Sequence, residues 1–180
     1  MFHKFMFVRL FLLCTSLSFA GLSLAEDLDL LPPVSIINST DLQSDGALAL
    51  QSQKPILILF AMQGCTYCQY VEEEHLKPML RNATYRSKVI IRRIMTDSYG
   101  SIIDFNGERV SSQELSSRYG AYLTPTVVFV DHQGNKLVQG IHGVRNTEYY
   151  GQDLDEGLDR SLLRIRERLA AVQKSPRKNL

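Results

Sequence analysis

Apolar residues gather in short blocks along the chain, and the spacing within each block predicts its secondary structure. Residues 56–60 are apolar without alternation, as expected of a central strand that is covered on both faces. Residues 89–94 form a second predicted strand. Residues 126–130 and 136–141 predict two antiparallel strands joined by a turn at 131–135. These four blocks are expected to form one sheet.

Helical spacing predicts helices around these strands. A short helix is expected at about 41–53, and a longer one at 67–82, where Pro78 predicts a kink. The last helix is expected at 147–172 because one apolar stripe runs along it. The stripe is formed by Leu154, Leu158, Leu162, Ile165 and Leu169. The charged residues of this segment are expected to form its solvent face.

A hairpin and one more helix are predicted from turn and capping signals. Residues 102–105 and 108–110 flank Asn106-Gly107, which is the strongest short hairpin signal in the chain. The capping box at 111–114 then opens a helix that Gly120 closes. The hairpin is therefore expected as an insertion between core elements.

Together these elements predict an α/β fold with a central mixed β-sheet flanked by helices. The first strands are expected to be parallel because helical crossovers link them, and the last pair is expected to be antiparallel. Residues 26–40 are expected to be irregular, since Pro32-Pro33 breaks regular structure. One domain is predicted at 41–172, followed by a flexible tail at 173–180.

Residues 1–25 have the features of a secretory signal peptide. Basic residues near the start precede an apolar centre at 10–13, and Ser23-Leu24-Ala25 matches a cleavage site. The mature protein is expected to begin at Glu26. An uncleaved N-terminal anchor is the alternative, although the apolar stretch is well short of the roughly 20 residues of a membrane span.

Charge and cysteine content narrow the function further. Without Lys4 and Arg9, which lie in the signal segment, the chain has 18 basic and 19 acidic residues, a net charge of −1. Nothing in this balance favours nucleic acid or anionic lipid as a partner. Cys14 would leave with the signal, so Cys65 and Cys68 alone remain and form no disulfide framework.

Cys65 and Cys68 are spaced Cys-x-x-Cys at the point where the predicted strand passes into a helix. The first sulfur then lies at the helix N-terminus, where unpaired N–H groups and the helix dipole favour thiolate over thiol. Cys65 is therefore expected to be the nucleophile and Cys68 the resolving thiol. Closing so small a loop stabilises a fold by only about 2 kcal/mol, so a redox role is favoured over a structural one.

The strand, the Cys-x-x-Cys helix start and the later Thr124-Pro125 before paired strands resemble the thioredoxin superfamily. Within it, residues 41–170 are similar to periplasmic thioredoxin-like proteins of the SoxW type. The resemblance implies a thioredoxin-like fold and a cis peptide bond at Pro125, whereas the residues alone leave a trans proline equally open. It also implies a substrate-binding surface formed by Gly64, Thr66, Tyr67, Thr124 and Pro125.

The chain departs from the family pattern at two positions. Leu59 stands where many thioredoxins have a buried aspartate, and Gly64 stands where a tryptophan commonly precedes the first cysteine. The usual proton acceptor for the second cysteine is therefore absent. Glu72, four residues after Cys68, is a possible replacement on the same helical face. The alternative is that Glu72 belongs to a solvated charged surface with its acidic neighbours.

The predicted function is an exported, periplasmic thiol-disulfide oxidoreductase that reduces disulfides of other proteins. It would need no cofactor beyond its own disulfide and no metal, and it is expected to be a monomer supplied with electrons by a membrane thiol carrier. Three alternatives remain open. They are a disulfide oxidase or isomerase on the same fold, a metal-binding module using both cysteines and His75, and a redox-inert binding protein.

Overall fold

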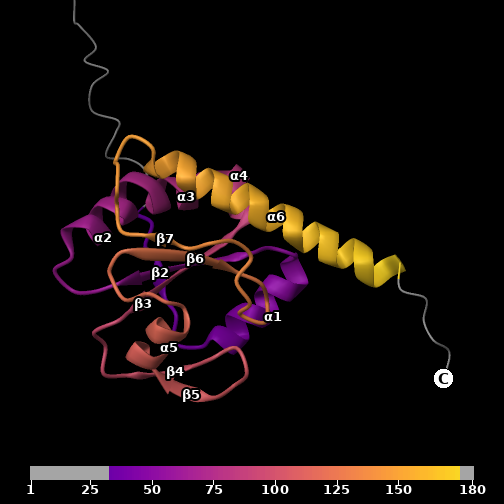
Figure 1. The fold of residues 1–180 in the computed structure, drawn as a ribbon, viewed down its shortest axis with the longest axis horizontal. Helices are drawn as coiled ribbons and strands as arrows, with labels where there is room; N and C mark the ends of the chain where they lie inside the picture. Colours follow the sequence, from indigo (N-terminus) through magenta and orange to yellow (C-terminus); the bar gives the residue numbers. More distant parts are fainter. Residues whose placement is uncertain (1–32, 175–180) are drawn as a thin grey trace, which may run out of the picture. The chain divides into compact units, whose positions relative to one another are not determined.

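This computed structural model describes residues 33–174. They fold around a central five-stranded mixed sheet (Figure 1). The strand order is β1-β3-β2-β6-β7. In that order the bounds are Ile37–Asn38, Ile90–Met95, Ile56–Ala61, Thr126–Val130 and Ile141–His142. β3 is parallel to both β1 and β2, whereas β6 is antiparallel to β2 and to β7. The predicted mixed sheet is confirmed.

Helices cover both faces of the sheet (Figure 1). On one face lie α2, the π-helical turn η2, α3, α4 and α6, with bounds Thr66–Val71, Glu72–Leu76, Lys77–Arg81, Ala83–Lys88 and Tyr150–Lys174. On the other face lie α1 (Leu42–Ser52) and α5 (Ser112–Arg118). Alternate residues of β2 divide between the two cores, so that Leu59 packs toward α2 and α6 while Phe60 packs toward α1 and α5.

The predicted hairpin is present as β4 (Ser101–Ile103) and β5 (Arg109–Ser111), a separate two-stranded sheet. Asp104 organises its turn, because the Asp104 carboxylate accepts N–H groups from Asn106 at 2.9 Å and Glu108 at 3.0 Å. Asp104 also accepts a hydrogen bond from Arg118 of α5 at 2.7 Å. The insertion is thereby attached to the helix that follows it.

Three short elements differ from the prediction. Residues 37 and 38 were expected to be irregular but form β1, since they pair with β3. α4 was not predicted; its N-cap is Asn82, whose side chain accepts the Thr84 N–H. The strand expected at 136–141 is interrupted. Val130 pairs with Lys136, and Val127 pairs with Ile141. Between these two pairs the chain advances by three residues on β6 and by five on the segment that leads into β7. The extra residues form a bulge.

The long helix after the cysteines is irregular just before Pro78. A π-helical turn, η2, separates α2 from α3, and the N–H of Lys77 donates to the carbonyl of Glu72, five residues earlier. Proline cannot donate a backbone N–H and its ring crowds the preceding turn, so a widened turn here is the expected consequence. The last helix begins at Tyr150, three residues later than predicted, and continues to Lys174.

The predicted signal segment lies outside the described residues, as do residues 26–32 of the irregular segment and 175–180 of the tail. Within residues 33–174, no helix combines the length and the apolar character that crossing a membrane requires.

Candidate redox site

The buried strand β2 delivers the two cysteines to one edge of the sheet. Every residue of Ile56–Ala61 is buried, which fixes the position of the strand and of the turn that follows it. Cys65 is the N-cap of α2, with extended backbone angles, and its Sγ accepts the backbone N–H of Cys68 at 3.1 Å. This sulfur therefore occupies the place of a capping oxygen at the helix start.

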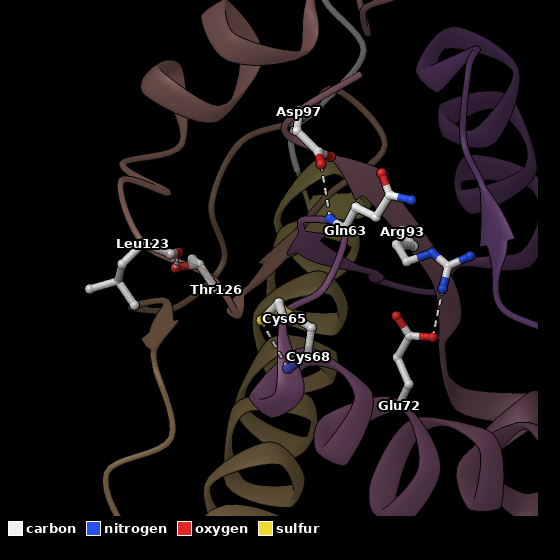
Figure 2. Close-up of a disulfide and its surroundings, with 8 residues drawn as sticks. All are labelled: Gln63, Cys65, Cys68, Glu72, Arg93, Asp97, Leu123 and Thr126. Carbon is white, nitrogen blue, oxygen red and sulfur yellow. Dashed lines mark hydrogen bonds and ion pairs between the residues drawn. A yellow bond between two sulfur atoms is a disulfide. The ribbon is translucent and has the colours of Figure 1, made fainter. Parts of the chain in front are cut away.

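Cys65 and Cys68 form a disulfide, with an S–S distance of 2.11 Å and a Cα–Cα distance of 5.2 Å (Figure 2). Cys68 is 2% exposed and belongs to the core between the sheet and α6, whereas Cys65 is partly exposed. An incoming reactant can therefore reach the sulfur of Cys65 more readily than that of Cys68.

The loop before β6 lies beside the disulfide. Thr126 pairs with Phe60 in the antiparallel β2–β6 ladder, so the start of β6 and the end of β2 meet at the same sheet edge. The peptide bond between Thr124 and Pro125 is cis. Thr126 Oγ1 donates to the Leu123 carbonyl at 2.7 Å, which closes the loop on itself (Figure 2).

A second support for this loop comes from the chain after β7. The N–H of Gly143 donates to the Pro125 carbonyl at 2.8 Å. Within residues 33–174, neither the N–H nor the carbonyl of Thr124 has a hydrogen-bond partner, and Thr124 is partly exposed. The loop thus presents one free backbone N–H and one free carbonyl at the edge that carries the disulfide.

The other predicted substrate contacts lie on the helix start. Gly64, Thr66 and Tyr67 are exposed, and Tyr67 keeps 58% of its surface accessible. Two further large side chains, Tyr122 at 82% and Leu123 at 50% exposure, precede Thr124. The structure therefore brings the predicted residues of both segments to one edge of the sheet, with exposed aromatic and apolar side chains among them.

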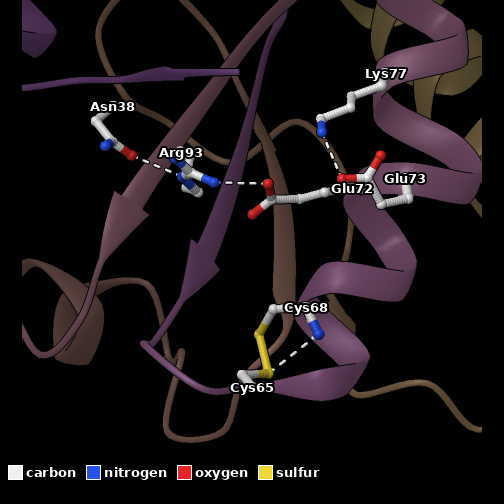
Figure 3. Close-up of polar contacts among 7 residues, drawn as sticks. All are labelled: Asn38, Cys65, Cys68, Glu72, Glu73, Lys77 and Arg93. Atoms are coloured by element: carbon white, nitrogen blue, oxygen red, sulfur yellow. Dashed lines mark hydrogen bonds and ion pairs between the residues drawn. A yellow bond between two sulfur atoms is a disulfide. The ribbon is translucent and has the colours of Figure 1, made fainter. Parts of the chain in front are cut away.

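Glu72 makes an ion pair with a strand residue. Its Oε2 lies 2.6 Å from Nη1 of Arg93, and the side chains of Glu72 and Arg93 are only 13% and 24% exposed (Figure 3). Arg93 also donates from Nε to the side-chain oxygen of Asn38 at 2.7 Å. Glu72 is therefore not part of a solvated surface, and among the described residues it has no hydrogen bond to either cysteine.

Leu59, the residue in place of the family's aspartate, is completely buried between Arg93 and Val127 in the strand register. His75, considered as a metal ligand with the cysteines, instead packs its ring against Tyr70 and Tyr150, with centroids 5.4 and 5.3 Å away. Burial lowers the pKa of His75, against the opposing charge of nearby carboxylates.

Sequence reasoning missed Arg93 and Asp97, which support the site from β3 and the loop after it. The Asp97 carboxylate accepts the backbone N–H of Gln63 at 2.9 Å, two residues before Cys65 (Figure 2). Arg93 could have been noticed, because Arg92-Arg93 interrupts an otherwise apolar strand and a charge there needs a partner. No comparable local signal identifies Asp97.

Sequence comparison agrees with this architecture. The model of a thioredoxin-like domain family matches residues 42–155, which is well over half of the chain. The chain belongs to this thioredoxin-like domain family. No curated protein matches the sequence.

Solved structures of thioredoxins are similar to this protein at low sequence identity. Fasciola hepatica thioredoxin is 16% identical, with a TM-score of 0.48, over 70% of this chain and 99% of its own. Malassezia sympodialis thioredoxin is 15% identical, with a TM-score of 0.49, over 73% and 96% of the two chains. The periplasmic thioredoxin SoxS of Paracoccus pantotrophus is 14% identical, with a TM-score of 0.41, over 60% and 99%.

Family membership and the geometry of the pair lead to the same chemistry. A thioredoxin-like domain with a Cys-x-x-Cys disulfide at the start of the helix after its central strand supports a thiol-disulfide oxidoreductase.

Proposed function

We propose that this thioredoxin-like protein is exported and reduces disulfides of extracytoplasmic proteins by exchange at Cys65 and Cys68. The observation that carries the proposal is the unequal surroundings of the two sulfurs. Cys65 is partly exposed at the N-cap of α2, and Cys68 is buried beneath it. This is the arrangement that an attacking thiol and a resolving thiol need.

In the first step the Cys65 thiolate attacks one sulfur of a substrate disulfide. A new S–S bond forms, the substrate S–S bond breaks, and the departing substrate sulfur leaves as a thiolate that takes up a proton. Cys68 then loses its proton and attacks Cys65 Sγ, which releases the second substrate sulfur. The substrate gains two electrons and two protons, and the protein ends with its own disulfide.

The backbone around Cys65 supports its thiolate. Cys65 Sγ already accepts the N–H of Cys68 at 3.1 Å in the disulfide form, and a full negative charge would strengthen that bond. The helix that begins at Thr66 adds the positive end of its dipole. Both effects favour Cys65 over Cys68 as the attacking sulfur.

The substrate segment would pair with the loop before β6. The free N–H and carbonyl of Thr124 can form a short strand-like pairing with an extended chain, as in other cases of β-strand addition. Pro125 follows Thr124 in this loop. On the helix side, the exposed Gly64, Thr66 and Tyr67 would border the bound segment. These contacts would hold the substrate disulfide against Cys65.

Glu72 remains our candidate for the group that removes the proton of Cys68. It lies one helical turn beyond Cys68, and its carboxylate is mostly buried and held by Arg93. Because no contact joins Glu72 to Cys68 in the disulfide form, the proton would travel through an intervening water.

A reductase in the periplasm needs a continuing supply of electrons. We propose that a membrane-embedded thiol carrier reduces the Cys65–Cys68 disulfide after each cycle, through the same exchange in reverse. The predicted signal peptide supports the location, and the exchange itself requires no cofactor beyond the disulfide and no second subunit.

The proposal is tested by trapping the mixed disulfide in cells that express the full chain. The Cys68→Ser variant should accumulate covalent complexes with periplasmic proteins, visible on non-reducing gels and lost on addition of dithiothreitol. The Cys65→Ser variant should not, and the double variant gives the background. Equal trapping by both single variants would contradict the assigned roles, and complexes at the level of the double variant would contradict the proposed activity.

A further inference from the structure

The turn between β2 and the dithiol helix is exposed and is held by hydrogen bonds. Within it the N–H of Cys65 donates to the Met62 carbonyl at 3.4 Å. Gly64 has a φ of +72°, in the left-handed region that favours glycine, and nothing lies within 4 Å of the position that a Cβ would take. Packing therefore does little to fix this turn, which determines where Cys65 lies.

One hydrogen bond from the loop after the neighbouring strand β3 holds the turn from outside. The backbone ladder between β2 and β3 ends where the N–H of Thr96 donates to the Ala61 carbonyl at 2.7 Å. Beyond that point the Asp97 carboxylate accepts the N–H of Gln63 at 2.9 Å (Figure 2). The side chain of Asp97 thus takes over where the backbone pairing stops.

Asp97 is itself held in place by the loop that contains it. The N–H of Ser98 donates to the Met95 carbonyl at 3.2 Å, and the Gln113 side chain donates to the Ser98 carbonyl at 3.5 Å. Gln113 belongs to α5, so the loop is attached at one end to β3 and at the other to a helix of the opposite sheet face. These two hydrogen bonds restrict where the Asp97 carboxylate lies relative to the turn.

We propose that Asp97 is a positioning residue for the redox pair, an inference that rests on the proposed function. Its hydrogen bond to Gln63 N–H holds the turn so that Cys65 Sγ faces both the substrate and Cys68. Its negative charge, close to the chain just before Cys65, disfavours the Cys65 thiolate. The reduced form is thereby destabilised relative to the uncharged disulfide, which makes the pair a stronger reductant.

Two substitutions separate the hydrogen bond from the charge. Asp97→Asn keeps an acceptor oxygen for Gln63 and removes the charge, whereas Asp97→Ala removes both. Asp41→Ala is the matched control, because Asp41 also accepts one backbone N–H at 2.9 Å, from Ser44 at the start of α1. Purified reduced protein is mixed with 5,5′-dithiobis(2-nitrobenzoate) to measure the exchange rate. The pH dependence of Cys65 alkylation gives the Cys65 pKa and so the fraction of thiolate. Dividing the exchange rate by that fraction gives the rate per thiolate.

The hydrogen bond should affect the rate, and the charge should affect the Cys65 titration. Asp97→Ala should slow exchange per thiolate by at least about threefold, since small displacements of reacting atoms are costly, while Asp97→Asn and Asp41→Ala stay near the unmodified protein. Both Asp97 variants should lower the Cys65 pKa by about half a unit and make the pair less reducing.

Either of two rate results would overturn the positioning role. One is an Asp97→Ala rate equal to that of Asp41→Ala, and the other is an Asp97→Asn rate as low as that of Asp97→Ala. An unchanged Cys65 pKa in both Asp97 variants would overturn the charge effect. The reagent 5,5′-dithiobis(2-nitrobenzoate) reacts with the cysteine pair without any protein substrate. These results are therefore independent of whether Cys68→Ser traps periplasmic proteins.

Discussion

At the residue level, a carboxylate on the helix and a guanidinium on the strand meet beside the redox pair. Glu72 extends from the end of the dithiol helix, and Arg93 comes from the strand position opposite Leu59. Each would be costly to bury alone, because a charge removed from water needs a partner. The ion pair therefore links the position of the helix to that of the central sheet.

The stability of this pair can be measured directly. Arg93→Met should lower the free energy of unfolding by about 1–3 kcal/mol, since it leaves the mostly buried Glu72 carboxylate without its cation. Arg160→Met is the control, because Arg160 and Glu156 are both 60% exposed and such pairs contribute under about 1 kcal/mol. Urea unfolding gives both values. Equal losses in the two variants would show that the Glu72–Arg93 pair is energetically an ordinary surface pair.

The same residues test whether Glu72 accepts the proton of Cys68. Glu72→Gln removes the acceptor while keeping similar shape, so it should slow the release of substrate from the mixed disulfide and leave the first attack by Cys65 unchanged. Stopped-flow measurement of the two phases separates these steps. A resolving phase as fast as in the unmodified protein would rule out Glu72 as the acceptor.

At the level of elements, local patterns identify the long ones and miss those that depend on distant partners. α1 and β2 were predicted within a residue or two because their signals, helical spacing and an unbroken apolar run, lie inside them. β1 has two residues and exists through its pairing with β3, and α4 buries none of its side chains. The bulge before β7 follows from the register with β6, which no local pattern contains.

The hairpin insertion gives a prediction about pH. Burial alone would raise the pKa of Asp104, but hydrogen bonds from Arg118 and from the N–H groups of Glu108 and Asn106 outweigh it, and the pKa lies below its ordinary value. The stabilisation from this lowered pKa is complete above the unfolded-state pKa of about 3.9 and is lost as the pH falls through the folded-state value.

Urea unfolding from pH 7 to pH 3 measures this contribution. Asp104→Asn should be less stable than the unmodified protein at pH 7, and the difference should shrink as the pH approaches 3. Glu156→Gln, at an exposed helix position, serves as the control and should run parallel to the unmodified protein. Parallel curves for Asp104→Asn as well would mean that the Asp104 carboxylate contributes no pH-dependent stability.

At the level of the whole molecule, the site is assembled from segments that only the sheet brings together. The Cys-x-x-Cys spacing and its strand-to-helix setting predicted Cys65 and Cys68 as the reacting pair, and the family resemblance added Thr124 and Pro125 as predicted substrate contacts. The role of Asp97, in the loop after β3, could not be predicted, because its contact with Gln63 follows from the parallel pairing of β2 with β3. Sequence therefore predicts the reacting groups better than the groups that hold them.

The direction of the reaction is a property of the whole pair in its surroundings, and its reduction potential measures it. Arg93 is paired with Glu72, and the Asp97 carboxylate holds the turn before Cys65, so neither group favours an unusually stable thiolate. We therefore expect residues 26–180 to have a potential near that of thioredoxin, about −270 mV. Equilibration in dithiothreitol buffers, followed by trapping of free thiols, gives the value. A potential near about −120 mV would mean that the reduced form is strongly stabilised and that the protein donates disulfides. If no intramolecular disulfide formed at all, exchange chemistry at this pair would be ruled out.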